Sequence, residues 1–289
     1  MKKLNDNYEE VQYSRLKIFK DVSKGNIDAD LKVISLGVGV QSTALYLMSS
    51  MGYKVPRADV AIFADTGGEY KETLQLLKWL LDWKDKNNGI PIYVNREKNL
   101  LKDLLKSAKD GTRCASIPVF SESGGMIMRQ CTQDYKILPV IKTTRMLHKL
   151  KPRQRMKPTE MWLGISTDEI ERMKDSVLYN IDYFYPLIYH RLSRTDCVNF
   201  FKENNFPVPV KSSCVFCPYH SNSFWAELQK ENGDAWKKSV EVDKAIRRKY
   251  GMDRDMYLHN SHKPLEEIDF EDKQLPLFEG FDCEGHCGL

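Results

Sequence analysis

Short apolar runs alternate with longer, partly polar segments along residues 31–165. Four of these runs predict buried strands, at residues 31–35, 59–64, 91–94 and 160–165. Helices are predicted between and after them, at residues 41–51, 69–86, 100–109 and 131–150. Such alternation is typical of an α/β protein, so we expect a parallel twisted sheet with helices on both faces.

The remaining segments carry weaker signals. Residues 110–130 contain Gly, Ser and Pro and predict a long irregular loop. Two segments predict further helices, at residues 193–204 and 221–250. Residues 260–289 hold few apolar side chains and predict an extended tail.

Composition places few limits on function. A chain of 289 residues can bury a full core, and its net charge of +4, from 44 basic and 40 acidic residues, is compatible with an anionic ligand. The first 27 residues are polar and show no signal peptide, and no segment approaches the roughly eighteen apolar residues of a membrane helix. We expect a soluble, cytoplasmic protein with no membrane partner.

A glycine-spaced loop follows the first predicted strand. Gly37 and Gly39 carry no side chains, so backbone N–H groups there can approach an anion closely. The helix predicted from Gln41 adds the positive end of its dipole, and Ser42 adds a hydroxyl donor. The spacing matches neither the Walker loop nor the dinucleotide fingerprint. The loop predicts a phosphate-bearing ligand, and the alternative is a tight turn without one.

Two further strand ends carry candidate residues. Asp65, Thr66 and Gly67 follow the second strand, where a carboxylate can hold Mg²⁺ or bind a ribose hydroxyl; the alternative is a cap for the helix at 69–86. Gly164 lies at the end of the strand predicted last and precedes an acidic turn. Since ligands of parallel sheets bind at the carboxyl ends of strands, we expect these residues at the ligand edge.

Cationic side chains suit the same kind of ligand. Arg129 and Lys136 lie near the start of a predicted helix, and Arg172 follows the last predicted strand; all three suit phosphate or sulfate, although a solvated helix face is the alternative. The basic loop at 149–157 could follow a nucleic-acid backbone. A solvated loop is the simpler interpretation, because no aromatic residues interleave with its charges.

Seven cysteines in a chain without an export signal favour metal or redox chemistry over disulfides. Two residues separate Cys214 from Cys217, a spacing at which both thiolates reach one metal. Cys283 and Cys287 could complete a four-cysteine zinc site. Alternatively, Cys131, the 214/217 pair and one tail cysteine hold a 4Fe–4S cluster. An unliganded pair of thiols is the remaining alternative.

Together these motifs resemble the PP-loop, or adenine nucleotide alpha hydrolase, superfamily. The most similar branch contains the phosphoadenosine-phosphosulfate (PAPS) reductases and the ATP pyrophosphatases of DNA phosphorothioation. The matching stretches are 35–42, 63–67 with 72–73, 131–136, 164–172, 185–187, 194–196, 214–217 and 287–289. The resemblance implies a Rossmann-like nucleotide-binding domain at 31–205, after an N-terminal extension at 1–30 and before a cysteine-containing cap and tail at 206–289.

The resemblance also implies ligands. An adenine nucleotide, either ATP or the sulfonucleotides PAPS and APS, would bind with optional Mg²⁺. Its contacts would come from Ser35, Gly37, Gly39, Gln41, Ser42, Asp65, Thr66, Gly67, Arg129 and Gly164. A 4Fe–4S cluster is implied on Cys131, Cys214, Cys217 and Cys283, with Cys287 or Cys197 as alternatives for the last position.

Three functions follow as alternatives. An ATP pyrophosphatase of sulfur metabolism would adenylylate an oxygen of DNA or tRNA and take sulfur from a donor protein such as a cysteine desulfurase. A PAPS or APS reductase would use Cys287 as its nucleophile, and the neutral Gln41, where ATP-cleaving members carry aspartate, favours it. The third is a zinc-stabilised nucleotide-binding subunit of a larger complex. The catalytic candidates are Cys287, Asp65, Lys136 and Arg172.

Overall fold

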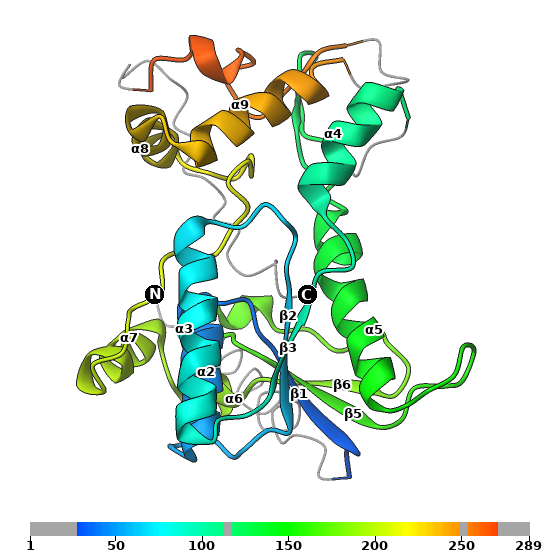
Figure 1. Ribbon diagram of the computed structural model, residues 1–289, viewed down its shortest axis with the longest axis vertical. Coiled ribbons are helices and arrows are strands. Elements are labelled where there is room, and N and C mark those ends of the chain that lie inside the picture. The colour runs from blue at the N-terminus through cyan, green and yellow to red at the C-terminus, as the bar shows by residue number, and fades with distance from the viewer. Residues whose placement is uncertain (1–27, 113–116, 249–253, 271–289) are drawn as a thin grey trace, which may run out of the picture. The chain divides into compact units, whose positions relative to one another are not determined.

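The sheet expected from the alternating pattern is present and has five parallel strands. The computed structural model describes residues 28–112, 117–248 and 254–270 (Figure 1). The strands lie in the order β3-β2-β1-β5-β6. In that order their bounds are Ile92–Asn95, Val60–Ala64, Leu31–Ser35, Thr159–Leu163 and Ile181–Phe184. Strand β1 pairs with β2 on one side and with β5 on the other. The expected α/β fold class is therefore confirmed.

The edge strand β6 is the strand of this sheet that the apolar pattern missed. It is four residues long, and the exposed Asp182 interrupts its apolar side chains. A strand at the edge of a sheet is less enclosed than a central one, so a continuous apolar run is not required. Its pairing with β5 places Thr159 opposite Ile181.

Helices connect the strands close to the predicted limits. The longer ones are α2 (Val40–Met51), α3 (Lys71–Asn87), α4 (Leu100–Asp110), α5 (Leu138–Leu147), α7 (Arg194–Glu203), α8 (Asn222–Glu231) and α9 (Asp234–Ile246). A short α6 spans Pro186–Tyr189. The helix predicted at 131–150 differs from the structure, because a π-helical turn, Gln133–Ile137, precedes α5. None of the helices in the described part of the chain has the length and apolar character needed to cross a bilayer.

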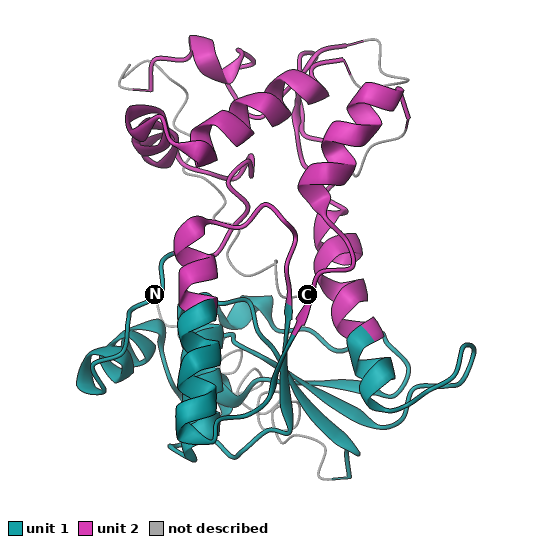
Figure 2. Ribbon diagram, in the orientation of Figure 1, with its two compact units in different colours: residues 1–63, 78–93, 143–210 teal, residues 64–77, 94–142, 211–289 magenta. Residues whose placement is uncertain are grey.

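The chain divides into two compact units, each assembled from separate segments (Figure 2). Unit 1 comprises residues 1–63, 78–93 and 143–210, and unit 2 comprises residues 64–77, 94–142 and 211–289. The contiguous domain limits expected from the sequence stay a prediction.

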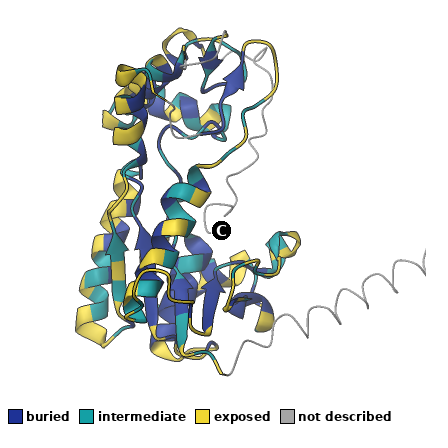
Figure 3. Cartoon of the chain, turned by 90° about the vertical axis from the view of Figure 1, so that its right-hand side faces the viewer, coloured by how far each residue is buried: buried dark blue, intermediate teal, exposed yellow. Residues whose placement is uncertain are grey.

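The core of unit 1 is the central sheet. All five residues of β5 are buried, and so are the β2 residues, as expected for strands covered on both faces (Figure 3). Trp162 on β5 and Tyr46 on α2 are among the largest fully buried side chains. The amphipathic α2 buries most of its residues against this sheet. Burial of one such large apolar side chain contributes about 1.5–3 kcal/mol.

Unit 2 has an apolar core of its own. Trp225 on α8 and Trp236 on α9 both pack against Phe270. Their ring centroids lie 6.5 and 6.3 Å, respectively, from the centroid of the Phe270 ring. The same cluster contains Leu104 of α4 and Phe216, which lies between the two cysteines of the 214/217 pair. The cysteine motif is therefore anchored by a buried aromatic side chain.

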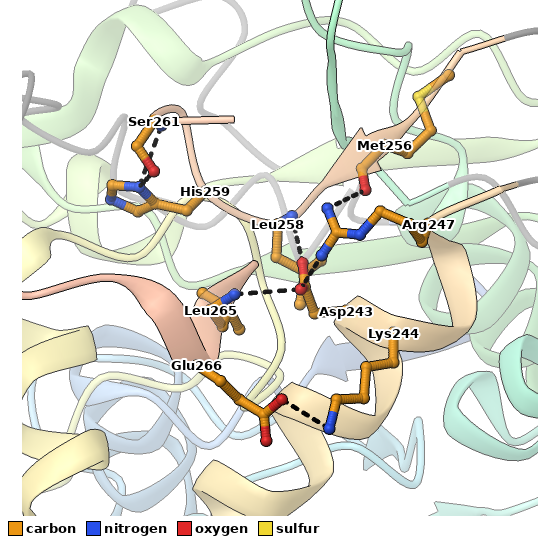
Figure 4. A network of polar contacts seen from close by, with 9 residues as sticks. All are labelled: Asp243, Lys244, Arg247, Met256, Leu258, His259, Ser261, Leu265 and Glu266. Atoms are coloured by element: carbon orange, nitrogen blue, oxygen red, sulfur yellow. Dashed lines mark hydrogen bonds and ion pairs between the residues drawn. The ribbon is translucent and has the colours of Figure 1, made fainter. Parts of the chain in front are cut away.

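A buried carboxylate organises the C-terminal segment of unit 2 (Figure 4). Asp243 on α9 accepts hydrogen bonds from the backbone N–H groups of Leu258, at 3.0 Å, and Leu265, at 3.2 Å, and it also binds Arg247. The Arg247 guanidinium donates in turn to the carbonyl of Met256 at 2.8 Å. Burial raises the pKa of Asp243 despite these donors. The network fixes residues 256–265 to α9.

Candidate functional site

The glycine-spaced loop joins β1 to α2 in unit 1, and its unusual backbone lies at Val38. This residue is fully buried and has a φ of 55°, whereas neither Gly37 nor Gly39 has a positive φ. A β-branched residue in the left-handed region is a clear outlier, and such strain concentrates at functional sites. The sequence pointed to the flanking glycines for close approach of their N–H groups to an anion, and it gave no signal for the left-handed backbone of Val38.

The first turn of α2 is held by a close contact with the end of β5. A Cβ atom at Gly164 would lie 2.6 Å from the Cα atom of Ser42 and 2.7 Å from its backbone nitrogen. Only glycine fits such an approach, so Gly164 is needed for space rather than for its own backbone freedom. The Ser42 hydroxyl accepts from the N–H of Gly39 at 3.2 Å. These contacts fix the shape of the loop without any ligand.

Gln41 leaves a hydrogen-bond donor unused at this point. Its side chain is 8 % exposed, and its Oε1 atom accepts from the Arg194 guanidinium on α7 at 3.4 Å. Its Nε2 atom is buried and has no hydrogen-bond partner among the described residues. A buried unpaired donor costs about 1–3 kcal/mol. Beside the positive end of α2, this amide suits an anion.

The acidic turn after Gly164 is a 3₁₀ helix, Thr167–Arg172. Asp168 accepts from the Ser166 hydroxyl at 3.0 Å and from the backbone N–H of Arg194. Arg172 forms an ion pair with Glu169 at 2.5 Å, and both side chains are largely buried. The acids therefore organise this turn, and the Arg172 charge is balanced within it. Ser35, the last residue of β1, lies between Ile62 of β2 and Leu163 of β5.

The segment after β2 belongs to unit 2 and forms a turn of its own. The Asp65 carboxylate accepts from the Gly67 N–H at 2.9 Å and pairs with Arg96 at 3.1 Å. Gly67 has a φ of 75°, and a Cβ atom there would overlap the Asn99 side chain. Helix α3 begins only at Lys71, so neither Asp65 nor Thr66 is its cap. The helix-cap alternative is therefore excluded for this motif.

Unit 2 contains a pocket in which three of the predicted metal ligands meet. It encloses about 430 Å³, its open mouth included. Its walls comprise Thr66, Leu100, Ile117, Pro118, Arg129, Cys131, Thr132, Lys136, Cys214, Phe216, Cys217 and Pro218. The structure thus brings together three cysteines, two cations and two threonines against an apolar wall.

A second carboxylate, Glu69, supports the pocket, and sequence reasoning missed it. Its side chain is 1 % exposed, and one carboxylate oxygen accepts from the Thr66 hydroxyl at 2.9 Å and lies 3.6 Å from the Lys136 ammonium. The other oxygen is buried without a hydrogen-bond partner in the described chain. Glu69 also pairs with Cys214 through an isolated β-bridge. No local sequence signal exists for this role, because the partners lie 67 and 145 residues further along the chain.

Lys136 comes from the π-helical turn, a rare element that is frequent at functional sites. Burial is the largest influence on the pKa of its ammonium group and lowers it, but the Glu69 carboxylate and the three cysteines together outweigh burial, so the net pKa lies above its ordinary value. Lys136 therefore remains a cation inside the pocket. Arg129 lies with its guanidinium 5.8 Å from the centre of the Tyr219 ring.

The three thiols share a buried environment. Burial raises the pKa of Cys131, Cys214 and Cys217, that of Cys217 to about 11, while Lys136 acts in the opposite direction on each. The Cys214 sulfur also lies 3.3 Å from the Thr66 hydroxyl. These thiols would become thiolates only with a stronger positive partner, such as a metal.

The described residues do not include a complete metal site. Within them, no three His, Cys, Asp or Glu side chains are grouped closely enough to hold a metal ion. Cys283 and Cys287, the predicted fourth ligand and tail nucleophile, lie outside the described residues. Cys197 is fully buried on α7 of unit 1 and does not line the pocket. The metal assignment therefore stays a prediction.

Comparison with known proteins finds similarity in structure alone. No family model matches the sequence, and no curated protein matches it. Among solved structures, PAPS reductase from Candida auris, in a phosphate complex, matches with a TM-score of 0.41 and 13% identity, over 63% of this chain and 77% of the reductase. The U34-tRNA thiolase NcsA from Methanococcus maripaludis, with its [4Fe-4S] cluster, matches with a TM-score of 0.42 and 15% identity, over 96% of this chain and 87% of the thiolase.

At these identities and TM-scores the two matches carry no argument about the function of this chain. The functional interpretation depends on the chain's own residues.

Proposed function

We propose that this protein is an adenine nucleotide alpha hydrolase that cleaves ATP to AMP and pyrophosphate in order to activate an oxygen of a nucleic acid for replacement by sulfur. The observation that carries the proposal is the pocket of unit 2, which is lined by three thiols and the buried cation Lys136. Thiols suit sulfur chemistry, and a buried ammonium group suits charge that develops on phosphate or sulfur.

Unit 1 supports the nucleotide part of the proposal. The preformed loop, with the unpaired Gln41 amide and the start of α2, offers donors to a polyphosphate. Gly164 keeps this end of α2 in place. In unit 2, Asp65 would hold Mg²⁺ through its carboxylate, a hard oxygen ligand of the kind that Mg²⁺ prefers.

The reaction balances without a change of redox state. The acceptor oxygen attacks the α-phosphorus, the bond from that phosphorus to the bridging oxygen breaks, and pyrophosphate leaves. Hydrosulfide then attacks the nucleic-acid atom that carries the adenylylated oxygen. The bond between that atom and the oxygen breaks, and AMP leaves with the oxygen and the electron pair of the broken bond. Within unit 1, Gln41 would orient the phosphates. Within unit 2, the cations Lys136 and Arg129 would stabilise negative charge on a ligand in the pocket.

A 4Fe–4S cluster is the proposed cofactor, and the thiols that line the pocket are the ligand type that such a cluster requires. Cys131, Cys214 and Cys217 would hold three of its irons, and a cysteine of the tail, Cys283 or Cys287, would complete the set. When bound, such a cluster supplies iron that binds sulfur. Lys136 and Thr66 would then donate hydrogen bonds toward the sulfur atoms, which is the arrangement that adjusts a metal site from outside its ligands.

Sulfonucleotide reduction is the second candidate, and the neutral Gln41 favours it. A reductase binds a sulfonucleotide in place of ATP. A thiolate attacks its sulfur and the nucleotide phosphate leaves; a second thiol then attacks the bound thiolate sulfur, so that sulfite leaves and the two thiols end as a disulfide. Both reactions would use the same loop. They differ in products, which makes them separable in one experiment.

The test is incubation of anaerobically purified protein with ATP–Mg²⁺ and nucleic acid and, separately, with PAPS and a dithiol reductant, followed by chromatography. AMP and pyrophosphate support the proposal, whereas sulfite from PAPS supports the reductase. A protein that binds and converts neither compound would contradict both. Iron, acid-labile sulfide and zinc are measured on the same sample, and stoichiometric zinc without iron would overturn the cluster assignment.

Matched variants connect each activity to its residues. Cys214→Ala should lose the metal, and Cys197→Ala, at a cysteine that does not line the pocket, should keep it. Gln41→Leu should weaken ATP binding roughly 10- to 100-fold, the loss expected for a hydrogen bond to a charged group. Gln75→Leu is its control, because Gln75 is exposed on α3.

A further inference from the structure

Two loops at the amino ends of β5 and β6 lie side by side in unit 1. The first, residues 148–158, precedes β5, and the second, residues 173–180, precedes β6. The Asn180 side-chain amide donates to the carbonyl of Met156 at 2.9 Å, and the Thr159 N–H donates to the carbonyl of Asn180 at 3.0 Å. The strand pairing thus fixes the two loops beside one another.

The first loop carries a dense positive charge. Its exposed cations are Lys149, Lys151, Arg153, Arg155 and Lys157. No acidic residue occurs in the sequence between Asp134 and Glu160, and Glu160 is buried. Carboxylates near the loops include Asp175 in the second loop, the exposed Asp182 on β6, and Asp30, whose N–H donates to the carbonyl of Pro158.

The shape of the basic loop is fixed by hydrogen bonds. The Arg145 guanidinium donates to the carbonyl of Lys151 at 3.2 Å and to that of Gln154 at 2.8 Å. The Lys151 N–H donates to the Gln154 side chain at 2.6 Å. Arg153 has a φ of 65° at the tip of this turn. A loop that only needs to be solvated does not require a buttressed backbone, so the order favours a binding role.

An aromatic side chain completes the surface. Tyr179 in the second loop is 61% exposed, and the Arg155 guanidinium lies 5.5 Å from the centre of its ring. This pair could not be predicted from the sequence, because Tyr179 comes 24 residues after Arg155. An exposed ring beside arginine is the combination on which unpaired bases stack.

We propose that the basic loop and Tyr179 bind a polynucleotide, with the cations on its phosphates and the ring against one unpaired base. This inference rests on the proposed function and identifies how its nucleic-acid substrate would be held. The glycine-spaced loop lies at the carboxyl ends of the same strands, and a five-residue strand spans about 16 Å. A single nucleotide in that loop does not reach the basic loop, whereas a polymer extends across both.

The test measures binding of fluorescent 20-nucleotide RNA and DNA single strands by anisotropy, at several salt concentrations. The triple variant Lys151→Gln/Arg153→Gln/Lys157→Gln should bind at least tenfold more weakly, and its salt dependence should be shallower by about two, since each phosphate contact on a single strand contributes about 0.7 to the slope. The triple variant Lys78→Gln/Lys86→Gln/Lys202→Gln removes the same charge from exposed sites elsewhere on unit 1 and should bind like the parent.

Tyr179 gives a second, independent measurement. Tyr179→Ala should weaken binding about tenfold with an unchanged salt slope, and Tyr179→Phe should restore it, because the ring rather than the hydroxyl stacks. Equal binding by the two triple variants would overturn the inference. So would binding of the parent to anionic phospholipid vesicles but not to either nucleic acid.

A measurement of ATP cleavage on the binding variants distinguishes failure of this inference from failure of the proposed function. Formation of AMP and pyrophosphate from ATP is measured on the same variants at saturating nucleic acid, which supplies the acceptor oxygen, and all of them should retain the maximal rate. Retained cleavage of ATP with unaltered polynucleotide binding would refute the surface and leave the enzyme assignment standing. Absence of ATP cleavage in the parent, with nucleic acid still bound through this surface, would refute the enzyme assignment alone.

Discussion

Replacement of Lys136 by methionine should destabilise unit 2 severely, because it removes the cation that faces a buried carboxylate. The Lys136 ammonium lies 3.6 Å from the Glu69 carboxylate, and their side chains are 14% and 1% exposed. At an effective dielectric constant of about 20, two unit charges at that separation attract by about 5 kcal/mol. Burial of both charges offsets much of this attraction in the intact pair.

Breaking such a pair on one side has a larger effect than the pair's net contribution. Lys136→Met leaves Glu69 buried with only the Thr66 hydroxyl on one oxygen and with no partner for the other among the described residues. We expect the free energy of unfolding at pH 7 to fall by about 3–5 kcal/mol. The double variant Lys136→Met/Glu69→Gln removes the stranded charge and should recover most of that loss.

The assay is urea unfolding followed by tryptophan fluorescence, with Trp225 and Trp236 reporting on the core of unit 2. The metal-free protein is compared throughout, so that ligand binding does not enter the cycle. The exposed Lys142→Met is the control for loss of a lysine. A loss below about 1 kcal/mol for Lys136→Met, or a double variant no more stable than the single one, would refute the account of this pair.

Three further predictions concern other parts of the fold. Gly164→Ala should place a methyl group 2.6 Å from the Ser42 Cα atom, cost about 1–3 kcal/mol as overpacking, and weaken ATP binding measured by calorimetry. Asp243→Ala should lower the unfolding free energy by about 3 kcal/mol, because Arg247 and two backbone N–H groups lose their buried partner. The assay is urea unfolding, and Asp234→Ala, at an exposed site on the same helix, is the control. Burial, aided by His262, lowers the pKa of His259 to about 4. Between pH 6.5 and 4 the unfolded chain therefore binds one more proton at this histidine than the folded chain does. The free energy of unfolding should fall by about 3 kcal/mol as the pH is lowered through that window. In urea unfolding at several pH values, a His259→Gln variant should lack this component.

The elements that follow from local patterns were predictable. Strands β1, β2, β3 and β5 are short and mostly apolar, and the helices between them begin and end near the predicted residues. The parallel sheet followed from their alternation. The glycine at position 164 was also singled out correctly as unusual, although the reason, contact with Ser42, is visible only in the folded chain.

Features that depend on contacts between residues far apart in the chain could not be predicted from the sequence. Glu69 meets Lys136 and Cys214 only after folding, and its own neighbours in sequence suggest a helix start. Tyr179 joins Arg155 because β6 pairs with β5, and β6 was itself missed. The left-handed backbone of Val38 had no sequence signal, since a β-branched residue rarely adopts it and glycines flank it on both sides. In each case the deciding interaction spans residues that no local window contains.

Departures from ordinary protein rules indicate where this chain has retained structure for binding. Buried polar atoms are nearly always hydrogen-bonded, and each exception costs about 1–3 kcal/mol. Two such atoms in the described residues are Gln41 Nε2, in the first turn after the strained loop, and one oxygen of Glu69, behind the cysteine pocket. Neither contributes to folding as it stands, and either would gain a partner from a ligand or a bound water. Because a donor is unpaired at the loop and an acceptor at the pocket, the two places should respond to different ligands: phosphate oxygens at Gln41, and a proton-bearing or cationic group at Glu69.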